Sequence, residues 1–121
     1  LKNSDYVSIH CPLNEKTKHI INAETLSLMK PTAFLINTAR GALIDEPALI
    51  EALKKGTIAG AGLDVQETEP PVEDNPLYTM ENVILTPHMG WKGLETRQRL
   101  VSILADNVQS YIKGNPINVV C

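Results

Sequence analysis

Three side chains that can do chemistry follow three separate apolar runs of the sequence: Arg40, Asp64 and His88. A guanidinium binds a carboxylate through two hydrogen bonds, a carboxylate accepts hydrogen bonds, and an imidazole exchanges a proton near neutral pH. Because the carboxyl ends of parallel strands share one sheet edge, where ligands bind in open α/β folds, the pattern predicts one ligand site. The position of Arg40 by itself is also typical of a solvated cation in a loop. The apolar runs that precede Asp64 and His88 are what favour a ligand site.

The apolar run 32–36 is the predicted strand that delivers Arg40. It is entered through Pro31, and its continuous apolar character is typical of a strand buried on both faces of a parallel sheet. Downstream, Asp45 is suited to cap a helix whose apolar residues recur at helical spacing as far as about Lys55. Arg40 therefore belongs to a strand-to-helix loop.

The remaining segments continue an alternation of strands and helices. The predictions are a strand over 6–11, a short helix over 22–29 capped by Asn22 with Leu26, Leu28 and Met29 facing inward, strands at 60–65 and 82–86, a helical turn over 75–80, and a long helix over 93–113. Strands that alternate with helices indicate an α/β fold with a parallel sheet and right-handed crossovers.

Composition narrows the class of protein and its partners. With 43% hydrophobic and 21% charged residues the chain can build a core, and a net charge of −3 gives no electrostatic reason to expect nucleic acid or an anionic membrane. No apolar run approaches the roughly 18 residues of a membrane span. Cys11 and Cys121 form neither a disulfide framework nor a CxxC metal site, so we expect no metal ligands and a cytoplasmic location.

His10 and Cys11 end the first predicted strand and so reach the same sheet edge. Either residue type can act as a catalytic base or nucleophile. No acidic or basic partner lies nearby in the sequence, and the favoured interpretation is a packed, inert pair.

The glycine pattern for a phosphate-binding turn is missing. Gly60 and Gly62 lack a third glycine and do not open a helix, so no GxGxxG turn is present. Because the first residues run straight into a strand, we expect these 121 residues to be part of a longer protein.

Three motifs occur in order along the chain. They are Ile36-Asn-Thr-Ala-Arg-Gly-Ala-Leu-Ile-Asp45, Ala59-Gly-Ala-Gly-Leu-Asp-Val65 with Glu69-Pro70, and Leu85-Thr-Pro-His-Met-Gly90. Together they resemble the D-isomer-specific 2-hydroxyacid dehydrogenases over nearly the whole chain. The resemblance implies a Rossmann-like half domain: residues 1–113 as the second half of a dinucleotide-binding domain, without its GxGxxG half, and 114–121 as a tail towards a substrate domain.

The resemblance also implies a role for each motif residue. Arg40 matches the family's substrate-binding arginine, Glu69 the acid before proline, and His88 the proton-transferring histidine, so these are the predicted catalytic residues. The segments that line the nicotinamide and its ribose match Cys11, Pro12, Thr38, Ala39, Arg40, Asp64, His88 and Gly90. The implied cofactor is NAD or NADP, with NAD favoured, and Asp64 is suited to accept a hydrogen bond from the nicotinamide carboxamide.

The implied activity is hydride transfer between a nicotinamide cofactor and a D-2-hydroxy acid or 2-oxo acid. The full-length protein is expected to be an NAD(P)-dependent dehydrogenase and a homodimer, and the isolated chain to be inactive. Gln66, where the family often has an aromatic residue, and Trp91 depart from the common pattern. The histidine loop resembles the glycerate or hydroxypyruvate subgroup. The alternative is a dinucleotide-binding interaction module of the corepressor type, without metabolic turnover.

The predicted strand ends also imply a contact that coordinates can test. The Glu69 carboxylate is expected within hydrogen-bond reach of the His88 ring. Glu67 is the rival partner, because an extended chain sends the side chains of residues 67 and 69 to the same side.

Overall fold

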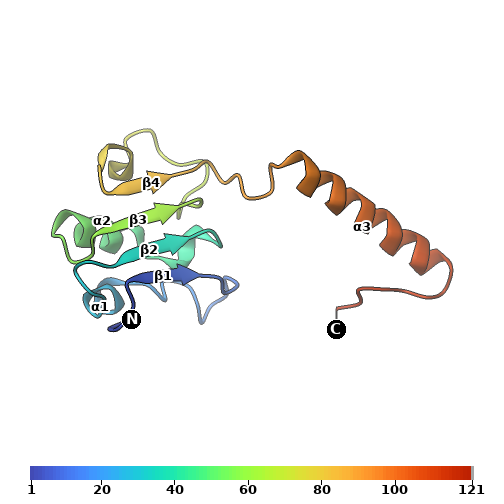
Figure 1. The fold of residues 1–121 in the computed structure, drawn as a ribbon, viewed down its shortest axis with the longest axis horizontal. Helices are drawn as coiled ribbons and strands as arrows, with labels where there is room; N and C mark the ends of the chain where they lie inside the picture. Colours follow the sequence, from blue (N-terminus) through green and yellow to red (C-terminus); the bar gives the residue numbers. More distant parts are fainter. Residues whose placement is uncertain (121) are drawn as a thin grey trace. The chain divides into compact units, whose positions relative to one another are not determined.

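The computed structural model describes residues 1–120, which form a four-stranded sheet, short helices and a long C-terminal helix (Figure 1). In chain order the elements are β1 (Tyr6–Ile9), α1 (Ala23–Ser27), β2 (Phe34–Asn37), the 3-10 helix η1 (Gly41–Leu43), α2 (Glu46–Lys54), β3 (Gly60–Leu63), the 3-10 helix η2 (Pro76–Thr79), β4 (Val83–Leu85) and α3 (Leu94–Ile112). Cys121 lies outside the described residues.

Contacts within the chain divide it into two units, residues 1–88 and the segment from Met89 onward. The boundary between these two units, after residue 88, differs from the predicted domain boundary after residue 113. The predicted boundary concerns the relation to a substrate domain, and it stays a prediction.

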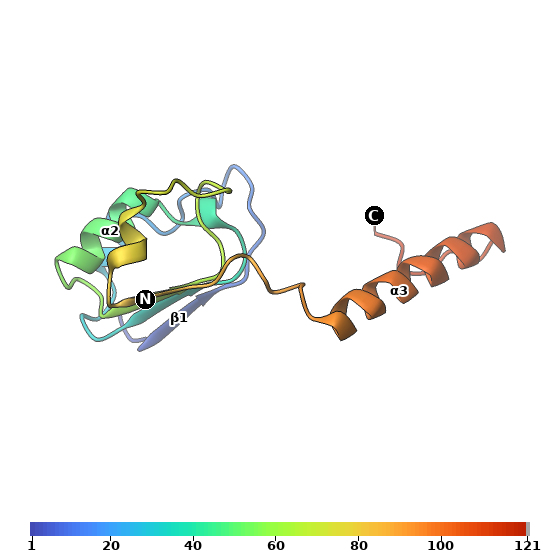
Figure 2. The same cartoon turned by 90° about the horizontal axis from the view of Figure 1, so that it is seen from above.

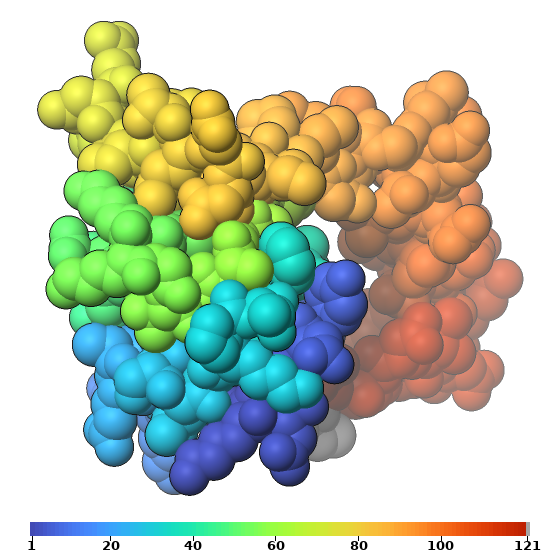
Figure 3. Space-filling view, turned by 60° about the vertical axis from the view of Figure 1, so that its left-hand side comes forward, coloured from blue at the N-terminus to red at the C-terminus, as the bar shows by residue number. Residues whose placement is uncertain are grey.

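The four strands run parallel in the order β1-β2-β3-β4. The register places Val7, Leu35, Ala61 and Val83 side by side. The helices that join consecutive strands lie on one face of the sheet (Figure 2). In the space-filling view, residues 1–88 are stacked in chain order from blue to gold (Figure 3). The predicted parallel α/β fold is confirmed.

The hydrophobic core lies between the sheet and the helices α1 and α2, which pack against each other. Leu35 of β2 has 0% of its surface exposed, and Leu26 and Leu49 from the two helices have 1% each. Burial of such side chains is the main contribution that stabilises the domain. The core therefore fixes the strands, and with them the loops at their carboxyl ends.

Side-chain caps set the points at which α1 and α2 begin. Asn22 accepts a hydrogen bond from the Thr25 N–H at 3.1 Å, and the Thr25 hydroxyl accepts one from the Asn22 N–H at 2.8 Å. This reciprocal arrangement is a capping box. Asp45 accepts from the Ala48 N–H at 3.1 Å, and Gly56, with φ of 67°, follows α2. Both predicted helix starts are confirmed.

The expectation that the strand at 32–36 is buried on both faces is wrong for the described structure. Leu35 faces the helices, whereas its neighbour Phe34 points to the other face and is 41% exposed. Tyr6 and Ile84 share that face and are 70% and 73% exposed. The physical reason is that side chains alternate along a strand, while the helices of residues 1–88 cover only one face.

The inward placement of Leu28 is also wrong, because 39% of its surface is exposed. Helix α1 has five residues and ends at Ser27, so Leu28 is its C-cap and lies off the packed stripe. Leu26 and Met29 are buried as expected, at 1% and 5% exposure.

The long C-terminal helix α3 spans Leu94–Ile112, close to the predicted 93–113. Gly93 is its N-cap, and Gly114, with φ of 77°, follows Lys113 at its end. None of the helices in the described residues has the length and apolar character that a membrane span requires.

Candidate active site

The loop that carries Arg40 is held by the last residue of β2. Asn37 is fully buried, and its side chain accepts a hydrogen bond from the Ala39 N–H at 3.0 Å and donates one to the Arg40 carbonyl at 2.9 Å. A buried amide that satisfies two backbone groups fixes the turn after the strand. The Arg40 guanidinium is exposed and donates to the Ala39 carbonyl at 2.7 Å.

Gly41 brings this loop against a second loop, the one that follows β3. A Cβ at position 41 would lie 1.8 Å from the Gln66 carbonyl oxygen and 2.5 Å from the Glu67 nitrogen. Only a residue without a side chain permits this approach of two backbones. The sequence interpretation missed both Asn37 and Gly41. One signal in the sequence could have identified Asn37: it is a polar residue two positions after Leu35, on the inward side of an apolar strand.

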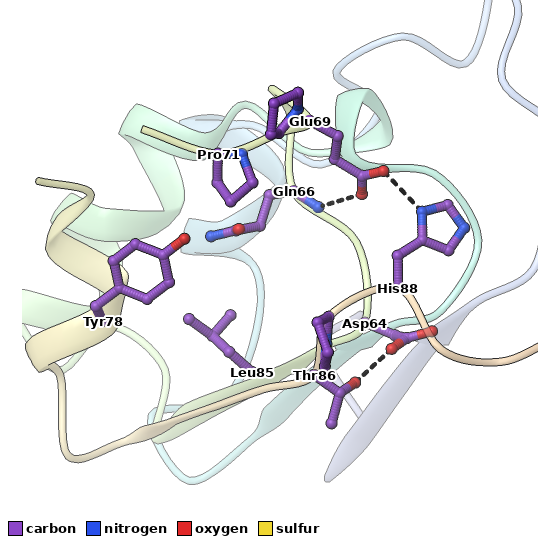
Figure 4. A pocket seen from close by; sticks show the side chains of 10 residues that line it. Asp64, Gln66, Glu69, Pro71, Tyr78, Leu85, Thr86 and His88 are labelled. Carbon is purple, nitrogen blue, oxygen red and sulfur yellow. Dashed lines mark hydrogen bonds and ion pairs between the residues drawn. The ribbon is translucent and has the colours of Figure 1, made fainter. Parts of the chain in front are cut away.

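Asp64 follows β3 and has 8% of its surface exposed. Its carboxylate accepts a hydrogen bond from the Thr86 hydroxyl, just after β4. The Thr86 N–H donates to the Leu63 carbonyl at 2.9 Å. These bonds tie together the carboxyl ends of β3 and β4, as Figure 4 shows for Asp64 and Thr86.

Glu69 and His88 form a hydrogen-bonded acid–base pair at this edge. The Glu69 Oε2 lies 2.7 Å from the His88 Nδ1, and the Glu69 Oε1 accepts from the Gln66 N–H at 3.1 Å (Figure 4). The predicted contact between Glu69 and His88 is therefore confirmed. The peptide bond between Glu69 and Pro70 is cis.

Glu67, the rival partner, lies elsewhere: its Oε1 is 2.6 Å from the His19 Nε2. The loop that contains residues 67–70 bends instead of running extended, so the two carboxylates do not point to the same side. The alternation that made Glu67 a rival holds for a strand and fails for a bent loop.

The backbone of His88 has a φ of 48°, in the left-handed region that is uncommon for residues other than glycine. Such conformations persist where the surrounding structure holds the backbone in place, and they cluster at active sites. Because Nδ1 faces Glu69, Nε2 is the ring nitrogen directed away from that carboxylate. The pair thus orients the imidazole for proton exchange at Nε2.

The pKa of the Glu69 carboxyl lies below its usual value. Burial by itself raises this pKa, but the hydrogen bonds from His88 and from the Gln66 N–H, with the positive charges of His88 and Arg40, lower it by more. Glu69 is therefore ionised at neutral pH and able to accept a hydrogen bond from the imidazole.

Hollows in the surface surround these side chains. One of about 270 Å³ is lined by residues that include Arg40, Glu69 and His88. The structure thus brings the three predicted catalytic residues to one hollow. A second, of about 340 Å³, lies on the β4 side and includes Asp64, Tyr78 and His88 in its lining (Figure 4).

Of the predicted cofactor residues, Arg40 and His88 line the first hollow, and Asp64 and His88 line the second. A neighbouring hollow of about 580 Å³ is lined by His10, Cys11, Pro12, Leu13, Ala39 and Arg40. Thr38 is exposed in the loop before Ala39. Gly90 belongs to the segment from Met89 onward, and its role stays a prediction.

The expectation that His10 is packed is wrong. Cys11 packs partly against the core, but His10 is exposed and lies 2.8 Å from the Ser8 hydroxyl through its Nε2. Strand β1 ends at Ile9, and the His10 side chain lies beside that of Ser8, two residues earlier, instead of packing against the core.

A parallel sheet whose carboxyl edge carries an arginine, a buried carboxylate and a carboxylate–histidine pair defines a Rossmann-type α/β domain equipped for proton exchange. Residues 1–90 match the model of the D-isomer specific 2-hydroxyacid dehydrogenase, NAD binding domain. The chain belongs to this family.

Two relatives show how far the similarity extends. The chain is 50% identical to the glycerate dehydrogenase of Methylorubrum extorquens, covering 99% of this chain and 39% of that protein. It is also 50% identical to the glyoxylate reductase of Korarchaeum cryptofilum, covering 99% of this chain and 36% of that protein. The chain thus spans well under half the length of these relatives.

Two solved structures share the fold. The D-lactate dehydrogenase of Lactobacillus jensenii with NAD⁺ has a TM-score of 0.91 at 35% identity, over 100% of this chain and 40% of that chain. An acyclic imino acid reductase in complex with NADPH and D-Arg has a TM-score of 0.89 at 45% identity, over 99% of this chain and 38% of that chain. The Rossmann-like fold class is thereby confirmed. The corepressor alternative gains no support from these comparisons.

Proposed function

We propose that the protein to which this chain belongs transfers a hydride between a nicotinamide dinucleotide and a small 2-hydroxy acid or 2-oxo acid. The observation that carries this proposal is the single hollow lined by Arg40, Glu69 and His88. It combines a cation for a carboxylate with a hydrogen-bonded acid–base pair for an alcohol or ketone oxygen.

Arg40 is the proposed substrate-binding residue. A guanidinium offers a planar pair of donors that matches a carboxylate, and it polarises a neighbouring carbonyl. Arg40 is exposed, while Asn37 holds its backbone. The arginine is therefore positioned by the fold and accessible to a small acid.

His88 is the proposed proton-transfer residue and Glu69 the residue that orients it. In the direction of reduction, the His88 Nε2 gives a proton to the ketone oxygen; in the direction of oxidation it takes the proton back. The 2.7 Å bond from Nδ1 to Glu69 holds the ring with Nε2 free to exchange the proton.

The residues at the edge fit a nicotinamide. The hollow lined by Cys11, Pro12, Ala39 and Arg40 offers both apolar and polar surface to the nicotinamide ring, and the Asp64 carboxylate is suited to accept from a carboxamide. When bound, the nicotinamide supplies or accepts the hydride. Of the two cofactors we favour NAD, since the matching family model describes an NAD binding domain.

The proposed substrates are glyoxylate and hydroxypyruvate. The chain is 50% identical to a glyoxylate reductase and to a glycerate dehydrogenase, and hydroxypyruvate is the 2-oxo acid that corresponds to glycerate. We further propose a homodimer in the cytoplasm, from the family resemblance and from cysteines without a disulfide framework. Light scattering of the full-length protein tests the dimer.

The decisive experiment is a turnover assay of the full-length protein with both oxo acids, each with NADH and with NADPH. We expect turnover in the wild type and a fall of about 10²–10⁴-fold in kcat for His88→Gln, because proton transfer contributes that much. Turnover by His88→Gln at the wild-type rate, with an unchanged pH profile, would make His88 structural and contradict the proposed mechanism.

A further inference from the structure

We propose that Glu67 is a positioning residue that holds Glu69, and through it the His88 ring, in the geometry for proton transfer. The proposal rests on the dehydrogenase function proposed above. It assigns a role to the acid that does not contact His88.

Glu67 is anchored by both its side chain and its backbone. Its Oε1 lies 2.6 Å from the His19 Nε2, and its Oε2 accepts from the Glu46 N–H at 3.3 Å. In return, the Glu67 N–H donates to the Glu46 carboxylate at 3.1 Å. Three segments, before α1, at the start of α2 and after β3, are thus joined at one residue.

The first anchor, His19, is itself fixed. Its N–H donates to the Ala42 carbonyl at 2.9 Å, and its carbonyl accepts from the Asn22 side chain at 3.1 Å. Its φ of 52° lies in the left-handed region. A histidine held in this conformation presents its ring to Glu67 from a rigid loop.

The second anchor, Glu46, is also fixed. Its Oε1 accepts from the Asn75 side chain at 2.7 Å, and Asn75 is 6% exposed. Glu46 stands in the first turn of α2, where the helix dipole favours negative charge. The helix dipole thereby offsets part of the repulsion between the carboxylates of Glu46 and Glu67.

The link from Glu67 to the active site is the adjacent residue. The Gln66 N–H donates to the Glu69 Oε1 at 3.1 Å, and the Gln66 carbonyl is pressed against Gly41. The peptide between residues 66 and 67 is held by the Glu67 N–H on one side and by Gly41 on the other, and this restrains the Gln66 N–H in the preceding peptide. The Gln66 N–H therefore holds the Glu69 carboxylate where it meets His88.

Positioning explains this network better than stability does. The side chains of His19 and Glu67 retain 35% and 28% exposure, and ion pairs with this much solvent contribute little to folding. Removal of Glu67 is therefore expected to alter geometry at Glu69 more than the fold.

The test uses kinetics of the full-length enzyme with a 2-oxo acid and NADH. We expect Glu67→Ala to lower kcat about 10²-fold, the effect of a displacement of about 1 Å in a catalytic group. Glu67→Gln keeps the acceptor oxygen for the Glu46 N–H and should restore most of the rate. The control is Glu73→Ala, an exposed acid in the same connection, which should leave kcat unchanged.

A double-mutant cycle separates positioning from a general structural effect. If Glu67 acts through Glu69, then Glu67→Ala combined with Glu69→Gln should be about as slow as Glu69→Gln alone. Independent, multiplicative losses would overturn the proposal, and so would an unchanged kcat for Glu67→Ala. A lower thermal midpoint with unaltered kcat per folded molecule would likewise show that Glu67 is only structural.

A measurement without turnover distinguishes failure of this proposal from failure of the proposed function. The ¹⁵N signals of the His88 ring, assigned by their loss in His88→Gln, report the bond to Glu69. They should move in Glu67→Ala and stay in Glu73→Ala, whether or not the protein reduces 2-oxo acids. Unmoved signals in Glu67→Ala would refute the positioning role even in an active enzyme.

Discussion

At the scale of single residues, the site depends on side chains whose chemistry tolerates little replacement. The Arg40 guanidinium donates to the backbone carbonyl of Ala39 and lines the hollow that His88 also lines. Its planar donors suit a carboxylate better than the point charge of lysine does.

We therefore expect Arg40→Lys in the full-length enzyme to lower kcat/KM for 2-oxo acids by about 10- to 100-fold, the effect of one lost charge-assisted hydrogen bond. The thermal midpoint should stay close to that of the wild type, because the Arg40 side chain is exposed. Kinetics and thermal unfolding of the same preparation measure both quantities. Normal kcat/KM values would remove Arg40 from the substrate site.

Glu69 provides a pH-dependent contribution to stability. Its pKa is lowered in the folded state, so the unfolded state binds more protons at acidic pH. The contribution is therefore present above the unfolded pKa, about 4.3 for glutamate, and is lost as the pH falls through the lower folded value.

Glu69→Gln should lower the thermal midpoint at pH 7, and the difference from the wild type should shrink progressively as the pH falls below about 4. Because the side chains of the pair are 37% and 41% exposed, the loss should not exceed about 1 kcal/mol. Thermal unfolding of both proteins between about pH 3 and pH 8 gives the comparison. A gap that grows at acidic pH would reverse the assigned sign.

At the scale of elements, the site results from loops after neighbouring strands. The Arg40 loop follows β2, the Glu69 loop follows β3, and His88 follows β4. Parallel pairing brings these strand ends to one edge although the residues are far apart in sequence. The backbone contact between Gly41 and Gln66 then sets the spacing between the first two loops.

Gly41→Ala should separate these loops, because its new Cβ would overlap a backbone carbonyl that cannot rotate away. We expect a loss of stability of about 1–3 kcal/mol, the usual effect of overpacking, together with reduced kcat/KM. Denaturant unfolding of the full-length protein measures the first. The neighbouring Ala42→Gly is the control and should cost less than about 1 kcal/mol. Equal effects of the two changes would contradict the role of the close approach.

Elements that follow from local rules were predictable from the sequence. Helix caps at Asn22 and Asp45, the glycine after α2 and the alternation of strands and helices depend on neighbouring residues, and all are confirmed. The pairing of Glu69 with His88 was also predictable, because strand order brings the two ends together.

Features that depend on tertiary contacts were not predictable. The different direction of Glu67 arises from a bend and from partners in two other segments. The exposure of Phe34 depends on which face the helices cover, and apolar composition does not reveal this. The need for glycine at position 41 arises only when a distant backbone approaches it.

At the scale of the whole molecule, we expect the chain to provide one part of a dinucleotide site. It contains no GxGxxG sequence, whose backbone N–H groups and following helix grip a pyrophosphate. The residues proposed to bind the cofactor are those expected at its nicotinamide end. The relatives it matches are more than twice as long.

We expect the 121-residue chain alone to show neither turnover of a 2-hydroxy acid nor binding of NADH at micromolar concentrations. Calorimetric titration of the purified chain with NADH tests this. The full-length protein is the positive control. A micromolar Kd for the chain alone would mean that a phosphate-binding turn lies within it.

The uncovered sheet face has a practical consequence for protein production. Tyr6 and Phe34 stack there with ring centroids 5.7 Å apart, and the exposed Ile84 lies on the same hydrophobic face. Exposed apolar surface of this kind promotes self-association of an isolated chain. Replacing these side chains with threonine would keep strand propensity and should reduce self-association of the isolated 121-residue chain. The same replacements would harm a longer protein in which parallel strands are covered on both faces.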